Sequence, residues 1–296
     1  MAEEGLQFSG LLPSGQTEQA TRHVVMFSSG AASWAAAKRV VERHGADGVV
    51  MLFADVKGSN PSPHAGEDED NYRFAQEASA NVGAPLVVVN EGRDIWDVYE
   101  DEHMLGNSRV APCSKQLKQL PCRSWLEANC DPLTTSVYVG LAVWEEDRVA
   151  GVESGWAPWR TGFPLMDAPA MGKREIHHWL RVEGLRPPRL YAMGFNHANC
   201  GGFCCRMGLA QAATLLRTFP ERYAYHEARE QAFRERWGRD VSFLRDRRDL
   251  TTTPLTLAAF RQRVELQPEL PLPDDEPGCD ACFTRPDAAL EDSPRD

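Results

Sequence analysis

The stretch from His23 to Trp34, HVVMFSSGAASW, decides the fold. It opens with an apolar run of strand type, continues through the small residues from Ser28 to Ser33, and leads into a helical segment that ends near His44. A small-residue loop between a strand and a helix N-terminus can bring backbone N–H groups against a phosphate, which the helix dipole also attracts. The same pattern is equally typical of a tight turn.

Three further apolar runs, at 48–54, 85–89 and 136–142, alternate with helical segments such as 67–82. Short apolar runs separated by helices predict a parallel sheet that is buried on both faces. Crossover rules then favour an α/β fold with a doubly wound, mostly parallel five-stranded sheet of the Rossmann-like kind. Beyond these runs we expect a loop over 151–172 and helices over 173–183, 204–218 and 220–237.

Ligands of such folds bind beside the carboxyl ends of the strands. Asp55 follows the second apolar run and would face the same crevice as the loop from Ser28 to Ser33. A carboxylate at this place can accept a hydrogen bond from a ribose hydroxyl or an adenine amino group. A strand-end cap is the alternative role for Asp55.

The composition is that of an ordinary globular protein, with 296 residues, 42% of them hydrophobic and 25% charged. No run of apolar residues is long enough for a membrane helix, and the N-terminus lacks the basic start and apolar core of a signal peptide. We therefore expect a cytoplasmic protein that does not bind membranes. The net charge of −11 argues against a general nucleic-acid binder.

The chain divides into four expected segments. A flexible N-terminal segment, 1–20, precedes a nucleotide-binding domain over 21–205. A helical extension over 206–266 follows, and the Pro/Asp/Glu-rich composition of 267–296 predicts a mobile acidic tail.

Eight cysteines in a cytoplasmic chain favour metal or redox chemistry over a disulfide scaffold. Three or four thiolates around one point select an iron–sulfur cluster or zinc. Gly201 and Gly202 would let the chain fold tightly around a metal. Cys122 and Cys130, near other apolar residues, are more typical of inert core cysteines. The cysteines fall into three groups, which are Cys113, Cys122 and Cys130, then Cys200, Cys204 and Cys205, and finally Cys279 and Cys282.

The stretch FSSGAASW resembles the pyrophosphate-loop motif SGGxDS of the adenine nucleotide alpha hydrolase superfamily. Ser28, Gly30 and Ser33 match the motif, whereas Ser29 replaces a glycine and Ala32 replaces the aspartate. The resemblance implies the HUP type of sheet and a bound adenine nucleotide, either ATP or an adenylyl sulfate. The missing aspartate puts ATP hydrolysis in doubt and favours the reductase branch of the superfamily.

Further motifs resemble the phosphoadenosine phosphosulfate reductase-like family. The cysteine-then-lysine pattern of Cys113 to Lys118 is followed by PLMDAP (164–169), GLRPPRLYAMGF (184–195) and the cysteines that start at Cys200. The family's closely spaced pair is CxxC, whereas this chain has CxxxCC. The implied metal ligands are Cys113, Cys200 and Cys204, with Cys205 as a fourth. They would hold a [4Fe-4S] cluster, and zinc with a histidine such as His197 is the rival.

The resemblance also implies basic contacts to the nucleotide. Arg109, Lys115, Lys118 and Arg148 are the candidates, and Gly140 begins a second nucleotide-contacting loop. Reductases of the superfamily carry a reactive cysteine on a C-terminal tail, and Cys279 and Cys282 match it by position alone. They are the candidate catalytic residues.

Three functions remain open at this point. The first is an enzyme of sulfur metabolism that reduces a sulfonucleotide with a thiol, helped by a thioredoxin-like reductant. ATP-dependent thiolation of a tRNA or a small molecule is its variant. The second is a nucleotide or redox sensor without turnover, and the third is a zinc-stapled protein that keeps only the fold. A homodimer is compatible with each of them.

Overall fold

A computed structural model describes residues 20–59, 62–107, 110–248 and 251–267. Its central feature is a five-stranded sheet in the order β3-β2-β1-β4-β5, and every neighbouring pair of strands is parallel. The fold is therefore the predicted doubly wound α/β fold of the Rossmann-like, HUP type, with a helical C-terminal extension. The strands are β1 (Arg22–Met26), β2 (Val49–Asp55), β3 (Leu86–Asn90), β4 (Thr135–Val139) and β5 (Arg160–Gly162).

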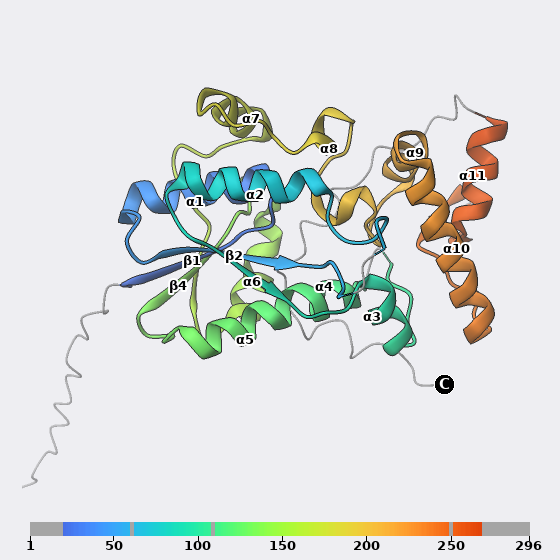
Figure 1. Cartoon of the computed structure of the whole chain (residues 1–296), viewed down its shortest axis with the longest axis horizontal. Coiled ribbons are helices and arrows are strands. Elements are labelled where there is room, and N and C mark those ends of the chain that lie inside the picture. Colours follow the sequence, from blue (N-terminus) through green and yellow to red (C-terminus); the bar gives the residue numbers. More distant parts are fainter. Residues whose placement is uncertain (1–19, 60–61, 108–109, 249–250, 268–296) are drawn as a thin grey trace, which may run out of the picture.

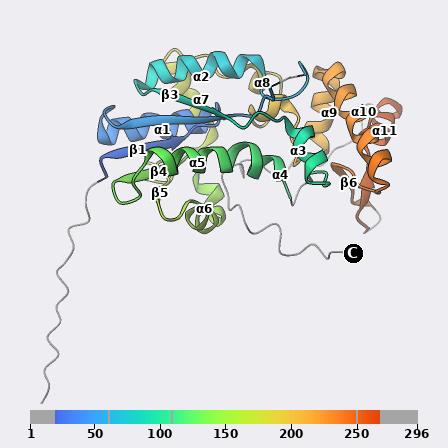
Figure 2. The same cartoon turned by 60° about the horizontal axis from the view of Figure 1, so that its bottom comes forward.

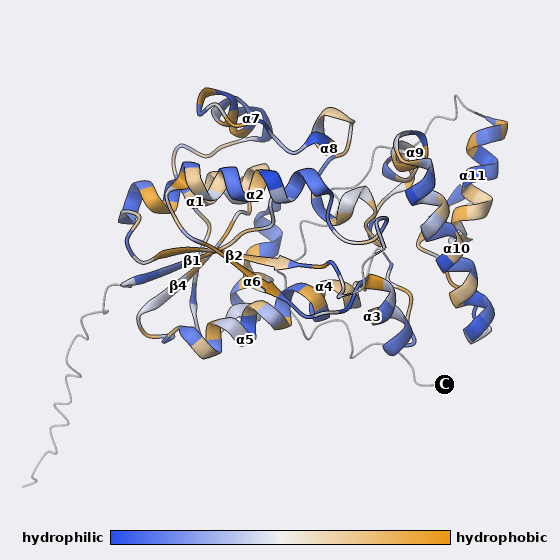
Figure 3. Ribbon diagram, viewed as in Figure 1, coloured by the Kyte–Doolittle hydropathy of each residue, from blue (hydrophilic) through white to orange (hydrophobic). Residues whose placement is uncertain are grey.

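Helices cover both faces of the sheet (Figures 1 and 2). Side chains alternate along β2, so that Leu52 packs into one apolar core and Phe53 into the other. Figure 3 shows the apolar strands between helices whose outer sides are hydrophilic. One face carries α1 (Ala31–His44), α2 (Glu69–Val82) and α7 (Lys173–Val182), and the other carries α5 (Leu120–Asn129) and α6 (Val149–Trp156).

The predicted loop over 151–172 is wrong in part. It contains most of α6 and the strand β5, where Val152, Trp156 and Trp159 are buried. Glycines and prolines concealed these elements, because apolar packing outweighs local propensity here. The helix predicted over 204–218 begins only at Leu209, since Cys204 to Gly208 are irregular apart from a turn at Cys205 and Arg206.

The C-terminal extension lies beyond the carboxyl ends of the strands (Figure 1). It contacts α3 (Ile95–Asp101), where Trp96 donates a hydrogen bond of 3.1 Å from Nε1 to Nδ1 of His226. The extension therefore packs against the end of the sheet at which ligands of this fold bind. Its elements are α9 (Leu209–Thr218), α10 (Pro220–Trp237), β6 (Leu244–Asp246), β7 (Thr253–Leu255) and α11 (Leu257–Leu266).

Among the described residues, none of the helices has both the length and the apolar character that a membrane crossing requires.

Candidate functional site

The loop after β1 gathers backbone N–H groups around one point. The N–H groups of Ser28 and Gly30 donate to Oγ of Ser33 at 3.2 and 3.3 Å, and this hydroxyl donates to the Gly30 carbonyl at 2.9 Å. The N–H of Ala31, the first residue of α1, donates to the hydroxyl of Tyr191 at 3.3 Å. An anion at this helix N-terminus would take the place of the Ser33 and Tyr191 hydroxyls as the acceptor of these N–H groups.

Ser29 stands where the resembling motif has a glycine. Its φ of +58° lies in the left-handed region that glycine adopts without strain. The buried Oγ of Ser29 donates a hydrogen bond of 2.7 Å to the carbonyl of Asn71, which holds the loop against α2. The backbone thus has the shape of a glycine-containing loop, with the side chain anchored behind it.

Gly140 brings the loop after β4 against the loop after β1. A Cβ atom at Gly140 would lie 3.0 Å from the carbonyl oxygen of Ala32 and 3.1 Å from Cα of Ser33. The next turn, η2 (Val143–Arg148), carries the Arg148 guanidinium, which pairs with Glu145. Nη2 of Arg148 is buried without a hydrogen-bond partner in the described structure.

Asp55 ends β2 at the same edge of the sheet. Its Oδ1 accepts hydrogen bonds from the hydroxyl of Tyr72 at 2.7 Å and from the N–H of Lys57 at 3.0 Å. Burial and the contact with Asp55 raise the pKa of Tyr72 well above its usual range. The carboxylate thus acts as a strand-end cap, while its predicted contact to a nucleotide stays a prediction.

Cys113 meets three cysteines from a distant part of the sequence in one small cavity, which we call the thiol cavity. Its volume is about 20 Å³. Sγ of Cys113 lies 3.7 Å from Sγ of Cys205, and the hydroxyl of Tyr99 donates to Sγ of Cys113 at 3.3 Å. The structure therefore brings together the predicted group of Cys113, Cys200, Cys204 and Cys205, and Lys118 joins them in the cavity lining.

The four thiols differ in environment. Cys113 and Cys200 are partly exposed, whereas Cys204 and Cys205 are buried. The hydrogen-bonded Cys113 thiol and burial raise the pKa of Cys205 well above its usual range. Burial also raises the pKa of Tyr99, so both groups keep their protons at neutral pH. The accessible thiols are thus backed by buried, protonated donors.

Lys118 points into the thiol cavity. Its Nζ lies 3.7 Å from Sγ of Cys200 and 3.3 Å from Oε1 of Glu67. Both charged groups are buried, and burial, opposed by Lys118, raises the pKa of Glu67. The ammonium is positioned to stabilise negative charge on the Cys200 sulfur. The predicted direct contact of Lys118 with a nucleotide stays a prediction.

Glu67 connects the thiol cavity to the loop after β1. Its Oε2 accepts the N–H of Cys200 at 2.6 Å and Nδ2 of Asn71 at 3.2 Å. The carbonyl of Asn71 in turn accepts the hydroxyl of Ser29. A chain of hydrogen bonds therefore links the two parts of the site. Sequence reasoning missed Glu67, because its acidic run had the pattern of an ordinary helix start.

The side chains as they stand do not fit a resident metal. The distance of 3.7 Å between the Cys113 and Cys205 sulfurs matches the edge of a tetrahedral site with zinc–sulfur bonds of about 2.3 Å. Yet within the described ranges no three His, Cys, Asp or Glu side chains are arranged to hold a metal ion. The cluster and the zinc both stay predictions.

The remaining candidates lie elsewhere. Arg109, Cys279 and Cys282 fall outside the described residues. Lys115 and the buried His197 do not line the thiol cavity. Burial raises the pKa of Cys122 to about 12, as expected for an inert core cysteine, and it also raises the pKa of Cys130.

In comparisons with known proteins, no family model and no curated protein matches this chain. Among solved structures it is similar to phosphoadenylyl-sulfate (PAPS) reductase from Candida auris in a phosphate complex. The two are 10% identical with a TM-score of 0.38, over 58% of this chain and 78% of the other. A likeness at this level carries no weight for the activity of this chain.

Proposed function

We propose that this chain is an enzyme of sulfur metabolism that binds an adenine nucleotide at the loop after β1 and reduces an adenylyl sulfate-type substrate with the thiols of the thiol cavity. The observation that carries the proposal is the linkage between the two parts. Ser29, Asn71 and Glu67 join the loop after β1 through hydrogen bonds to the backbone of Cys200, which lines the thiol cavity.

The nucleotide half of the proposal rests on the sheet topology. The strand order reverses between β1 and β4, and ligands of open α/β sheets bind at such a reversal, beside the carboxyl ends of the strands. The loops after β1 and β4 meet there at Gly140. We propose that Ser28, Gly30 and Ser33 bind phosphate oxygens, with the unpartnered Nη2 of Arg148 as a further donor.

The thiol half rests on the pair formed by Cys113 and Cys205. The Cys113 thiolate attacks the sulfonyl sulfur, the bond from sulfur to the phosphate oxygen breaks, and AMP or its 3′-phosphate leaves. Cys113 then carries an S-sulfonate. The Cys205 thiol, 3.7 Å away, attacks Sγ of Cys113 and releases bisulfite, which takes the proton. The resulting disulfide is reduced by an external dithiol of the thioredoxin kind.

Nucleotide binding tests the first half of the proposal. We expect wild-type protein to bind ATP, adenylyl sulfate or its 3′-phosphorylated form in titration calorimetry, and Gly140→Ala to bind at least tenfold more weakly. The added methyl group would press on Ala32 and Ser33 and push the two loops apart, at a stability cost of about 1–3 kcal/mol.

Gly151→Ala is the matched control, because a Cβ atom at this helical glycine meets nothing within 4 Å. We expect this variant to bind like wild type and to unfold at an equal or slightly higher temperature. Absence of binding by the wild-type protein to all three nucleotides would contradict the proposal. Equal binding by the two glycine variants would show that the loop after β4 is not part of the nucleotide site.

A further inference from the structure

Helix α7 carries a stripe of basic side chains. Lys173, Arg174, His177 and Arg181 recur at spacings of three, four and seven residues, which places them on one side of the helix. Ile176 and Leu180 face the core instead. Like charges at such spacings destabilise an isolated helix, so the stripe is a cost to the fold.

The stripe forms one wall of a groove of about 700 Å³ between α7 and α8 (Arg189–Ala192), which we call the basic groove. Arg186 and Arg189 bring further guanidinium groups from the second wall. No Asp or Glu side chain of the described part of the chain lines it. The groove thus concentrates positive charge in a protein whose net charge is −11.

Acidic neighbours neutralise only two of the five cations. Arg189 forms two hydrogen bonds of 2.7 Å to Asp68, and Arg186 lies 3.1 Å from Asp70. Lys173, Arg174 and Arg181 form no ion pair with any residue that the structure describes. Burial, and then Arg181 and Lys173, lower the pKa of His177, which is consistent with an excess of positive charge.

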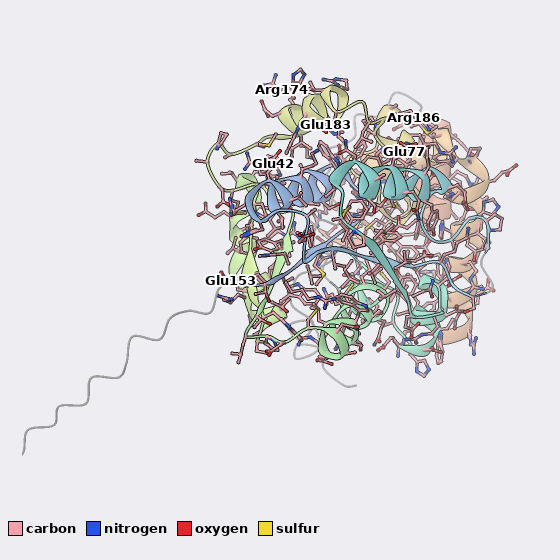
Figure 4. The ribbon with its side chains drawn as sticks, turned by 60° about the vertical axis from the view of Figure 1, so that its left-hand side comes forward. Glu42, Glu77, Glu153, Arg174, Glu183 and Arg186 are labelled. Atoms are coloured by element: carbon pink, nitrogen blue, oxygen red, sulfur yellow. The ribbon has the colours of Figure 1, made fainter. Side chains whose placement is uncertain are left out.

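Figure 4 shows Arg174 and Arg186 on the outer side of the molecule, with Glu183 and Glu77 nearby. Both acids are bound elsewhere, since Glu183 pairs with Lys38 at 2.9 Å and Glu77 pairs with Arg73. Lys173, Arg174 and Arg181 are therefore available to bind an external anion.

The groove also reaches the loop after β1. Tyr191 lines the groove, and its hydroxyl accepts the N–H of Ala31 at the start of α1. Its ring packs edge-on against His177, with 4.8 Å between the ring centroids. A ligand in the groove would thus lie beside the proposed nucleotide site.

We propose that the basic groove binds linked phosphate groups. Three cations without an acidic partner among the described residues follow one wall, and two acid-paired guanidinium groups stand on the other, an extended arrangement that suits phosphates in a row. Two sources carry this chemistry, a single nucleic-acid strand and a free polyphosphorylated molecule. The site does not depend on the proposed sulfur chemistry, and its failure would leave that proposal intact.

The test measures the binding of two probes to the wild-type protein and to the double variant Arg174→Glu/Arg181→Glu. The probes are a fluorescent twelve-nucleotide single strand, whose binding is followed by anisotropy, and tripolyphosphate, whose binding is followed separately by titration calorimetry. Whichever probe the wild-type protein binds, we expect the double variant to bind it at least tenfold more weakly. For a strand, the slope of log Kd against log salt should also fall by roughly 1.4, about 0.7 for each lost phosphate contact.

The matched control is Arg245→Glu/Arg247→Glu, which changes the net charge equally on the C-terminal extension. Binding of the strand with loss only in the groove variant supports the proposal with nucleic acid as the source. Binding of tripolyphosphate alone, with the same pattern, supports it with a free polyphosphate. If neither probe binds, or if both variants lose affinity equally, the proposal is wrong.

Discussion

Glu67 and Lys118 show at the scale of single residues how the site is held together. A buried carboxylate and a buried ammonium, 3.3 Å apart, tie the segment before α2 to the helical turn that follows Cys113 and to the backbone of Cys200. Removal of one partner leaves the other charge buried without a counter-charge, in an environment that solvates it poorly. The pair therefore holds in place the segments that line the thiol cavity.

A double-mutant cycle tests this pair. We expect Lys118→Met and Glu67→Gln each to lower the free energy of unfolding by about 3–5 kcal/mol, because each leaves one buried polar group unmatched. The double variant should lose clearly less than the sum of the two. Urea unfolding measures all four proteins, and additive losses would show that the two side chains do not interact.

The sequence allowed the gathering of thiols to be predicted at this scale, but not their surroundings. Cys113, Cys200, Cys204 and Cys205 stood in a recognisable order, and the structure brings them together. The left-handed Ser29 and the buried Glu67 carry no such signal, because their roles come from contacts with Asn71. Neighbours distant in the chain decide what a serine or a glutamate does.

A π-helical turn, η1 (Lys115–Gln119), explains at the scale of elements how Cys113 and Lys118 reach one cavity. Residues five apart in a regular α-helix point about 140° away from each other. The wider turn lies between α4 (Pro112–Ser114) and α5, with the N–H of Leu120 bonded to the carbonyl of Lys115. Both side chains then line the thiol cavity. Such turns occur often at functional sites.

The elements themselves were predictable where periodicity was strong. The four apolar runs became β1 to β4, whereas β5 and α6 stayed hidden in a segment rich in glycine, proline and tryptophan. Aromatic packing explains this failure, because Trp156 and Trp159 are buried by contacts that local sequence does not reveal. Trp144 differs from them, with 46% of its surface exposed beside the loop after β4.

At the scale of the whole molecule, the C-terminal extension packs beyond the carboxyl ends of the strands (Figure 1). Glu230 on α10 fixes that extension by accepting the N–H groups of Phe243 at 3.0 Å and Leu257 at 2.6 Å. Burial raises the pKa of Glu230 from its ordinary value of 4.5 to about 7. The sequence predicted helices here, but not this buried acid.

The stability of the fold should therefore depend on pH through Glu230. Between the unfolded pKa near 4.5 and the folded pKa near 7, the folded state binds more protons, so stability falls as pH rises through this range. The change amounts to about 3 kcal/mol. Glu230→Gln cannot titrate, so the stability advantage of wild type over this variant should be larger at pH 5 than at pH 8.

Urea unfolding of both proteins at several pH values measures that difference. Other titrating groups, such as His226, whose pKa burial lowers well below its usual range, are common to both proteins and cancel. A difference that stays constant from pH 5 to pH 8 would show that Glu230 is ionised in the folded protein throughout.

We propose above all that the loop after β1 and the thiol cavity form one functional unit. The most direct test of this proposal is peptide mapping of reduced protein after anaerobic incubation with adenylyl sulfate and its 3′-phosphorylated form. We predict S-sulfonated Cys113 or a Cys113–Cys205 disulfide, with one nucleotide product released for each modified chain. Cys113→Ser should abolish the reaction, and Cys130→Ser should preserve it. Unmodified cysteines, with nucleotide bound but intact, would contradict the account.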